Sequence, residues 1–254
     1  MIYKADNKLR KKLLPMFEEF DSTVVLSCLQ GHMGTAWVDD LNKPTVAQLI
    51  VGIFVFYAGN SKAKESDELL YNLPDFTLAI ANTEEWKEKI ESVHKGYFEK
   101  FQRFEFHKNS SHLNKADLNE YLKQIPEGYK LVQIDSQIAK DPTLHGLSED
   151  FISQFNSVND FVKRGIGFAI LKEGEIVCGA TSYSIFDDGI EIEIATHPNH
   201  RRKGLATIAA SALIKECLNR DLYPSWDGAN FESARLAEKL GYQLKTTYDT
   251  YFIE

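Results

Sequence analysis

The stretch from residue 189 to residue 220 constrains the fold more than any other part of the chain. It reads GIEIEIATHPNHRRKGLATIAASALIKECLNR, which predicts a strand over 189–196, a short polar turn and a helix over 205–219. The turn carries the consecutive cations Arg201, Arg202 and Lys203, followed by Gly204. Because the first N–H groups of a helix lack intrahelical partners and carry the positive end of its dipole, this arrangement predicts a site for a phosphate-type anion.

Two other phosphate-binding patterns are excluded. A P-loop requires the string G-x-x-x-x-G-K-[ST], which does not occur in the sequence. Gly165 and Gly167 begin a G-x-G, but a third glycine is missing and no helix is predicted to follow. General nucleic-acid binding is also excluded as a first expectation, because 29 Lys and Arg against 37 Asp and Glu give a net charge of −8.

The composition is that of a packed globular protein, with 43% hydrophobic and 26% charged residues. At about 150 residues per domain, 254 residues suit one large domain or two modest ones. The sequence shows no signal peptide and no apolar run of membrane-spanning length. Cys28, Cys178 and Cys217 lie far apart without metal-ligand spacing. We therefore expect a cytoplasmic protein with no metal site and no membrane contact.

Both halves of the chain mix helical and strand patterns, which predicts an α/β class with mixed sheets. In the first half, the spacing predicts a helix over 7–20 and one continuous strand over 45–58. In the second half, a helix over 148–163 precedes three strands over 167–171, 175–186 and 189–196, and helices over 205–219 and 230–240 follow them. The turn sequence Ile125–Pro126–Glu127–Gly128 marks the expected boundary, which divides the chain into domains 1–125 and 126–254.

Several segments of the second half together resemble one known superfamily. Arg201, Gly204 and Ala206 fit the pattern R/Q-x-x-G-x-G/A directly after a strand, which is similar to the acetyl-CoA pyrophosphate loop of the GCN5-related N-acetyltransferase (GNAT) superfamily. The preceding ATHPNH and the later N-x-x-S and EKLGY resemble that superfamily's strand end and final helix. The resemblance implies the GNAT fold, an acyl-CoA N-acyltransferase fold, for 126–254.

A narrower likeness concerns the whole chain. The strings THPNHRRKGLA and LYPSWDGAN and the length upstream are similar to a two-domain subgroup that includes zwittermicin A self-resistance acetyltransferases. This likeness implies that residues 1–125 form a family-specific α/β domain, with a degenerate copy of the GNAT fold as one alternative. Since residues 1–125 show no second loop motif, such a copy would bind no CoA.

The resemblance also implies acetyl-CoA as co-substrate and assigns residues to it. Backbone N–H groups of the turn would hold the pyrophosphate, and backbone groups at the end of the preceding strand would pair with the pantetheine arm and hold the thioester carbonyl. Two positions of the final predicted helix would also touch CoA. The expected CoA contacts are Ile194, Ala195, Thr196, Arg201, Arg202, Lys203, Gly204, Leu205, Ala206, Thr207, Asn230 and Ser233.

The chemistry requires a base, because an ammonium group has no lone pair with which to attack. Glu191 and Glu193 are the candidates: in a strand they share one face, and if the alternating isoleucines pack on the core the glutamates face the cleft or solvent. Two carboxylates on an exposed sheet face are the alternative interpretation. The superfamily's usual proton donor, a tyrosine, is replaced by Ala237, and no other acid is assigned; Tyr242 is expected in the core.

The resulting expectation is an N-acetyltransferase that acetylates a primary amine of a small molecule, such as an amine-bearing antibiotic or metabolite. The second half carries −6 of the net −8 charge, which favours a cationic acceptor. Acetylation of a protein or peptide amine, or a non-catalytic module that binds acyl-CoA, are the alternatives. The oligomeric state is left open.

Overall fold

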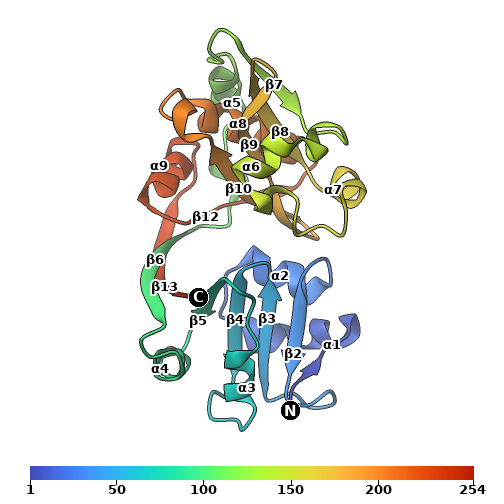
Figure 1. The fold of residues 1–254 in the computed structure, drawn as a ribbon, viewed down its shortest axis with the longest axis vertical. Helices are drawn as coiled ribbons and strands as arrows, with labels where there is room; N and C mark the ends of the chain where they lie inside the picture. The colour runs from blue at the N-terminus through green and yellow to red at the C-terminus, as the bar shows by residue number, and fades with distance from the viewer. The chain divides into compact units, whose positions relative to one another are not determined.

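The computed structural model describes every residue from 1 to 254 and divides the chain into two compact units (Figure 1). Unit 1 comprises 1–103 and 247–254, and unit 2 comprises 104–246. These bounds differ from the expected division at 125/126, because α5 (Lys115–Leu122) packs against α8 (Leu205–Asn219) and the chain end returns to unit 1 as part of β13 (Leu244–Ile253). The assignment of 1–125 to a family-specific domain and of 126–254 to the acetyltransferase domain stays a prediction.

A five-stranded mixed sheet forms the centre of unit 2. Its order is β11-β10-β9-β8-β7, with β10 and β11 parallel and the other neighbours antiparallel. Helix α8 packs on this sheet, as do α6 (Pro142–Leu147) and η4 (Glu149–Phe151). The predicted bounds of β9, β10 and α8 are confirmed. The strands are β7 (Tyr129–Gln133), β8 (Gly167–Lys172), β9 (Glu175–Phe186), β10 (Gly189–Thr196) and β11 (Tyr223–Ser225).

The predicted helix over 148–163 is wrong. Only η4 and α7 (Val158–Arg164) are helical there, because Ser157 caps a new helix by accepting a hydrogen bond from the Asp160 N–H. The irregular residues between them still bury Ile152 and Phe155, which produced the helix-like pattern. The remaining elements of unit 2 are η2 (Ser110–His112), η3 (Ile138–Lys140), η5 (Pro198–His200), β12 (Asp227–Gly228) and α9 (Phe231–Lys239).

Unit 1 is built on a sheet of order β1-β2-β3-β4-β5-β13. The predicted strand over 45–58 is instead a hairpin of β3 and β4, turned at Gly52 with φ 58°. Most residues of both strands are buried, so the apolar pattern runs through the turn. The predicted helix over 7–20 is divided near Pro15 into α1 and η1. The elements are β1 (Tyr3–Lys4), α1 (Asn7–Lys12), η1 (Leu14–Phe17), α2 (Thr23–Gln30), β2 (Thr35–Val38), β3 (Val46–Val51), β4 (Phe54–Gly59), α3 (Ser66–Tyr71), β5 (Thr77–Ala81), α4 (Glu84–Val93) and β6 (Phe98–Phe106), whose end lies in unit 2.

The two units repeat one strand plan. β1 to β5 have the same order and the same succession of three antiparallel pairs and one parallel pair as β7 to β11. In each unit a helix connects the parallel pair, α3 in unit 1 and α8 in unit 2. This agreement supports the alternative that the first half is a diverged copy of the second. The two units differ in the length of this connecting helix: α3 has 6 residues and α8 has 15.

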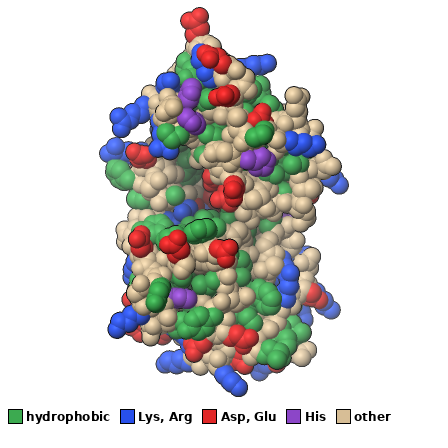
Figure 2. Space-filling model, viewed as in Figure 1, with side chains coloured by type: hydrophobic (Ala, Val, Ile, Leu, Met, Phe, Trp, Pro, Cys, Tyr) green, Lys and Arg blue, Asp and Glu red, His purple; other side chains and the backbone are tan.

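Each unit has its own apolar core. In unit 1 the indole of Trp86 stacks on Tyr57, with ring centroids 5.2 Å apart, and Tyr251 of β13 joins the same cluster. In unit 2 the core between α8, α9 and β10 includes Trp226 and Tyr242. No helix is both long and apolar enough to cross a bilayer. On the face shown in Figure 2, Lys and Arg side chains are scattered among Asp and Glu instead of forming a continuous basic surface.

Candidate active site

Strand β10, the second strand of this sheet, has an open edge over part of its length. Strand β11 pairs with β10 only over Gly189, Ile190 and Glu191, and the chain then leaves to form β12, which pairs with β6. The following residues of β10, 192–196, therefore have a strand neighbour on one side only, which is β9. A strand edge without a neighbour offers backbone N–H and C=O groups to an extended ligand.

The backbone groups that face this edge can be assigned. The His197 N–H donates to Val177 O at 2.9 Å, which continues the β9 ladder beyond Ala195 and Gly179. Because antiparallel residues alternate between bonding toward and away from a partner strand, Ile192, Ile194 and Thr196 direct their backbone groups to the open edge. The Thr196 carbonyl accepts from Arg201 Nε at 3.2 Å. The backbone groups of Ile192 and Ile194 are thus placed to pair with a ligand.

The turn after β10 leads directly into the start of α8. Arg202 has φ 61°, and Gly204, with φ 77°, is the N-cap residue of α8. Since glycine has no side chain, no side chain caps the helix, and a Cβ at Gly204 would meet nothing within 4 Å. The first N–H groups of α8, those of Leu205, Ala206 and Thr207, are the groups that an anion binds at a helix start.

Side chains from other elements of unit 2 approach the turn and the start of α8. Lys203 Nζ donates to the Tyr129 hydroxyl at 3.1 Å, and Lys172 Nζ lies 5.3 Å from the centre of the Tyr129 ring. From α9, Lys239 Nζ donates to Thr207 Oγ1 at 3.2 Å. The contributions of Tyr129, Lys172 and Lys239 were missed by sequence reasoning, since all three lie far from the turn in the sequence and belong to no local motif.

The positive charge at the turn is reflected in the titration of His200. Partial burial lowers the pKa of His200, and the charges of Lys203, His197 and Lys172 lower it further. Bound phosphate groups would cancel these charges and favour the imidazolium. We therefore expect CoA to raise the His200 pKa, measured by NMR titration of the ring protons from pH 5 to pH 8. His94 of unit 1, whose pKa is lowered mainly by burial, is the control and should not respond; an unchanged His200 pKa would argue against an anion at this turn.

The two candidate carboxylates lie on one face of β10 but in different surroundings. Ile192 and Ile194 pack on the core of unit 2, so Glu191 and Glu193 lie on the opposite face. Glu193 is half-buried, and its Oε1 accepts from Ser148 Oγ at 3.1 Å. Glu191 is only 5% exposed. Glu191 therefore does not lie on an exposed sheet face, because it has a neighbouring strand on both sides. That either carboxylate faces the cleft stays a prediction.

The expected contacts on the last helix have defined partners within unit 2. Asn230 caps α9 by accepting from the Ser233 N–H at 2.9 Å, and Ser233 Oγ accepts from Trp226 Nε1 at 3.1 Å. Their contact with CoA stays a prediction. Ala237 is fully buried. The core position of Tyr242 is confirmed: its hydroxyl donates to Pro224 O at 2.6 Å, and burial raises its pKa well above the usual value.

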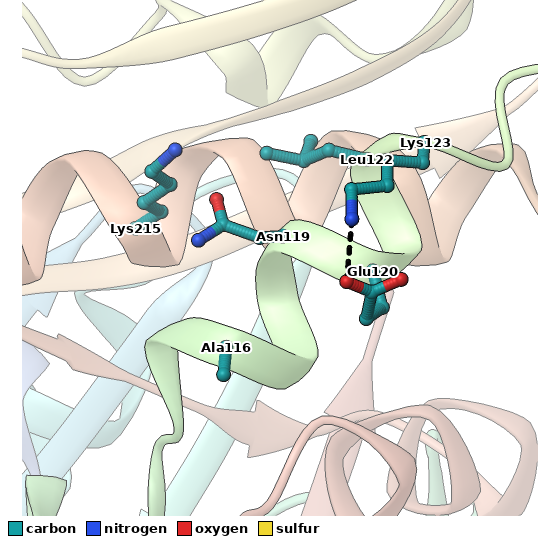
Figure 3. A pocket seen from close by; sticks show the side chains of 6 residues that line it. All are labelled: Ala116, Asn119, Glu120, Leu122, Lys123 and Lys215. Atoms are coloured by element: carbon teal, nitrogen blue, oxygen red, sulfur yellow. Dashed lines mark hydrogen bonds and ion pairs between the residues drawn. The ribbon is translucent and has the colours of Figure 1, made fainter.

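The rest of the molecule offers little competing chemistry. Burial raises the pKa of Cys28 to about 11 and those of Cys178 and Cys217 to about 12, so none is a reactive thiolate at neutral pH. No three His, Cys, Asp or Glu side chains are grouped to hold a metal. A hollow of about 550 Å³ between α5 and α8 contains none of the expected site residues (Figure 3); it is lined by Ala116, Asn119, Glu120, Leu122, Lys123 and Lys215.

Strand β10 of the mixed sheet parts from its parallel neighbour and then leads through a cationic turn into a helix without a side-chain cap, an arrangement that fits the acyl-CoA site expected from the sequence. The chain belongs to the GNAT acetyltransferase family, whose family model matches residues 14–251. The fold and enzyme class expected from the loop motif are thereby confirmed.

Known proteins resemble the chain over its whole length. It is 27% identical over 267 residues to YdfB of Bacillus subtilis (strain 168), an uncharacterised N-acetyltransferase, covering 99% of this chain and 98% of the relative. The crystal structure of a GCN5-related N-acetyltransferase-like protein from Streptococcus suis 89/1591 is 30% identical with a TM-score of 0.89, covering 97% of this chain and 99% of that one. A tandem GNAT protein from the clavulanic acid biosynthesis pathway, 10% identical with a TM-score of 0.55 over 100% and 98% of the chains, is similar in fold alone.

Proposed function

We propose that the protein transfers an acetyl group from acetyl-CoA to a primary amine of a small molecule. The observation that carries this proposal is the continuity of the open edge of β10 with the cationic turn and the start of α8. An extended molecule with amide groups along one part and a pyrophosphate further on can pair with Ile192 and Ile194 and end at the helix start. Pantetheine and the pyrophosphate of CoA have this order of groups.

The residues of the turn fit the pyrophosphate by charge and by space. The open volume at Gly204 allows a phosphate to approach the backbone, and Arg201, Arg202 and Lys203 are exposed and cationic. Acetyl-CoA, when bound, supplies an acyl group activated as a thioester. The fixed N–H groups at the edge of β10 would stabilise negative charge that develops on the carbonyl oxygen during attack.

A carboxylate of β10, Glu191 or Glu193, would accept the proton that the acceptor ammonium must lose. Glu193 is fixed by Ser148, which precedes η4, and Glu191 lies where β10 and β11 part. At the usual proton-donor position Ala237 has no group to donate. The thiolate would leave without an assigned acid, since a thiol is far more acidic than an alcohol.

The charge of this sheet face supports a cationic acceptor. The 3-10 helix η4 packs against β10 and carries Glu149 and Asp150. Burial raises the pKa of Asp150, and the negative charge of Glu149 raises it further. Glu191 and Glu193 on β10 add to the same negative field, which attracts an ammonium group.

The test combines acetyl-CoA with spermidine, kanamycin or L-lysine and follows thiol release with a chromogenic disulfide. We expect release with at least one amine and a product heavier by one acetyl group in mass spectrometry. Glu191→Gln and Glu193→Gln, made separately, should show which carboxylate is the base through a fall in kcat of about 100-fold. CoA binding in calorimetry without thiol release would instead indicate an acyl-CoA-binding module, and no binding of CoA would overturn both interpretations.

A further inference from the structure

Two buried serines flank Glu191 on the strands to either side. Ser184 of β9 and Ser225 of β11 are both paired in register with Glu191. Residues paired directly across neighbouring strands present their side chains on the same face of the sheet. Both serines are fully buried, and neither hydroxyl has a hydrogen-bond partner among the protein atoms. Two orphaned donors therefore lie beside one buried carboxylate.

The position of this serine pair on the sheet is as informative as its burial. Ser225 is the last residue of β11, so the pair marks the point where β10 and β11 part. The β9–β10 ladder has its irregularity at the same place: Ile192 pairs with Ser182, which leaves Tyr183 as an extra residue on β9. A bulge disturbs the ladder and bends the strand locally. Burying a hydroxyl without a partner is costly, and ordered water is the usual remedy at a polar buried position.

We propose that Ser184 and Ser225 hold a water molecule against the Glu191 carboxylate, and that this water passes the proton of the acceptor ammonium to Glu191. The two serines are positioning residues that act through the water. This inference rests on the proposed function. It selects Glu191 over Glu193 as the base and explains how a carboxylate with 5% exposure can exchange protons with an acceptor bound beyond the point where β10 and β11 part.

The step balances in atoms and charge. The ammonium group gives a proton to the water, and the water gives one of its own to Glu191, which leaves a neutral amine and a carboxylic acid. The amine nitrogen forms a bond to the acyl carbon, and the carbon–sulfur bond breaks with its electron pair on sulfur. The remaining excess proton on nitrogen passes through solvent to the thiolate, and Glu191 releases its proton to solvent before the next turnover.

The first test measures stability and needs no substrate. Removing an orphaned buried hydroxyl relieves an unfavourable burial, so Ser→Ala should raise the thermal midpoint or leave it unchanged. If the hydroxyls hold water, Ser184→Ala and Ser225→Ala should each lower the midpoint, by about 2–4 °C. Ser27→Ala on α2 is the matched control, because Ser27 is equally buried and also lacks a hydrogen-bond partner. A rise in the midpoint for all three variants would overturn the proposal.

The second test separates this inference from the proposed function. In the acetyl-CoA and amine assay the double Ser184→Ala/Ser225→Ala variant should lose at least about tenfold in kcat, with an unchanged KM for acetyl-CoA. A crystal structure of the wild-type protein should show one water within hydrogen-bond distance of both hydroxyls and of Glu191, absent from the variant. An active wild type with an equally active double variant would overturn the inference alone. A wild type without thiol release would overturn the proposed transfer, while the midpoints and the crystal structure would still decide whether the serines hold water.

Discussion

Gly204→Asp is expected to abolish measurable binding of CoA in calorimetry, whereas Gly204→Asn should weaken it far less. Gly204 has φ 77° at the N-cap of α8, a conformation that asparagine and aspartate tolerate better than other side chains. A Cβ at this position meets no atom within 4 Å, so both variants should fold. They differ by one negative charge placed where the pyrophosphate is proposed to bind.

The size of the effect follows from electrostatics. At about 5 Å and an effective dielectric constant of about 20, two like unit charges repel by about 3 kcal/mol, which is more than ~100-fold in Kd. The Gly204→Asn variant carries the same steric change and the same backbone strain, and is therefore the matched control. Circular dichroism should show equal helix content for both. Equal Kd values for the two variants would mean that the phosphate does not bind at the start of α8.

Local sequence signals were sufficient where a segment's structure depends on its own residues. Strands β9 and β10 and helix α8 have the predicted bounds because each has a strong period and a turn at its end. The cationic turn was identified for the same reason. By contrast, most residues of β3 and β4 are buried, and their continuous apolar run concealed the turn at Gly52.

The sequence predicted only part of the candidate site, because the other part is formed by strand pairing and tertiary contacts. The open edge of β10 exists because β11 stops pairing after Ser225, and no residue of β10 signals this. Lys239 and Tyr129 reach the turn from α9 and β7 through tertiary contacts. Ser184 and Ser225 are placed beside Glu191 by register alone. Strand register depends on the whole sheet, so the local sequence of one strand does not specify which residues it pairs with.

The relation between the units was likewise invisible in the sequence, which contains no internal repeat of residue identity. The two units share strand order and direction, which depend on burial pattern and connection geometry. Unit 1 lacks the open strand edge and the long helix that unit 2 has after its corresponding strand. Its parallel pair stays joined over four consecutive residues of β4, 54–57, and α3 is too short to provide a comparable helix start.

Tyr251→Ala should cause a large loss of stability in unit 1. Tyr251 is fully buried in β13, pairs with Ala79 of β5, and donates from its hydroxyl to Glu91 Oε1 at 2.9 Å. Lys100 Nζ lies 5.2 Å from its ring centre. Truncating a buried aromatic side chain to alanine costs about 3–5 kcal/mol. Urea unfolding followed by tryptophan fluorescence should show this loss, since Trp86 belongs to the same core cluster.

Two variants separate the contributions of Tyr251. Tyr251→Phe keeps the ring and removes the hydroxyl with its hydrogen bonds to Glu91 and Lys100, so it should cost about 1 kcal/mol. Leu244→Ala changes the other end of β13, where the side chain is 43% exposed, and should cost less than about 0.5 kcal/mol. Hydrogen exchange should rise in peptides of β4 and β5 for Tyr251→Ala and stay unchanged in β8 and β9. Equal losses for Tyr251→Ala and Tyr251→Phe would place the stabilisation in the hydrogen bond, and unchanged exchange in β5 would mean that unit 1 does not depend on the last strand of the chain.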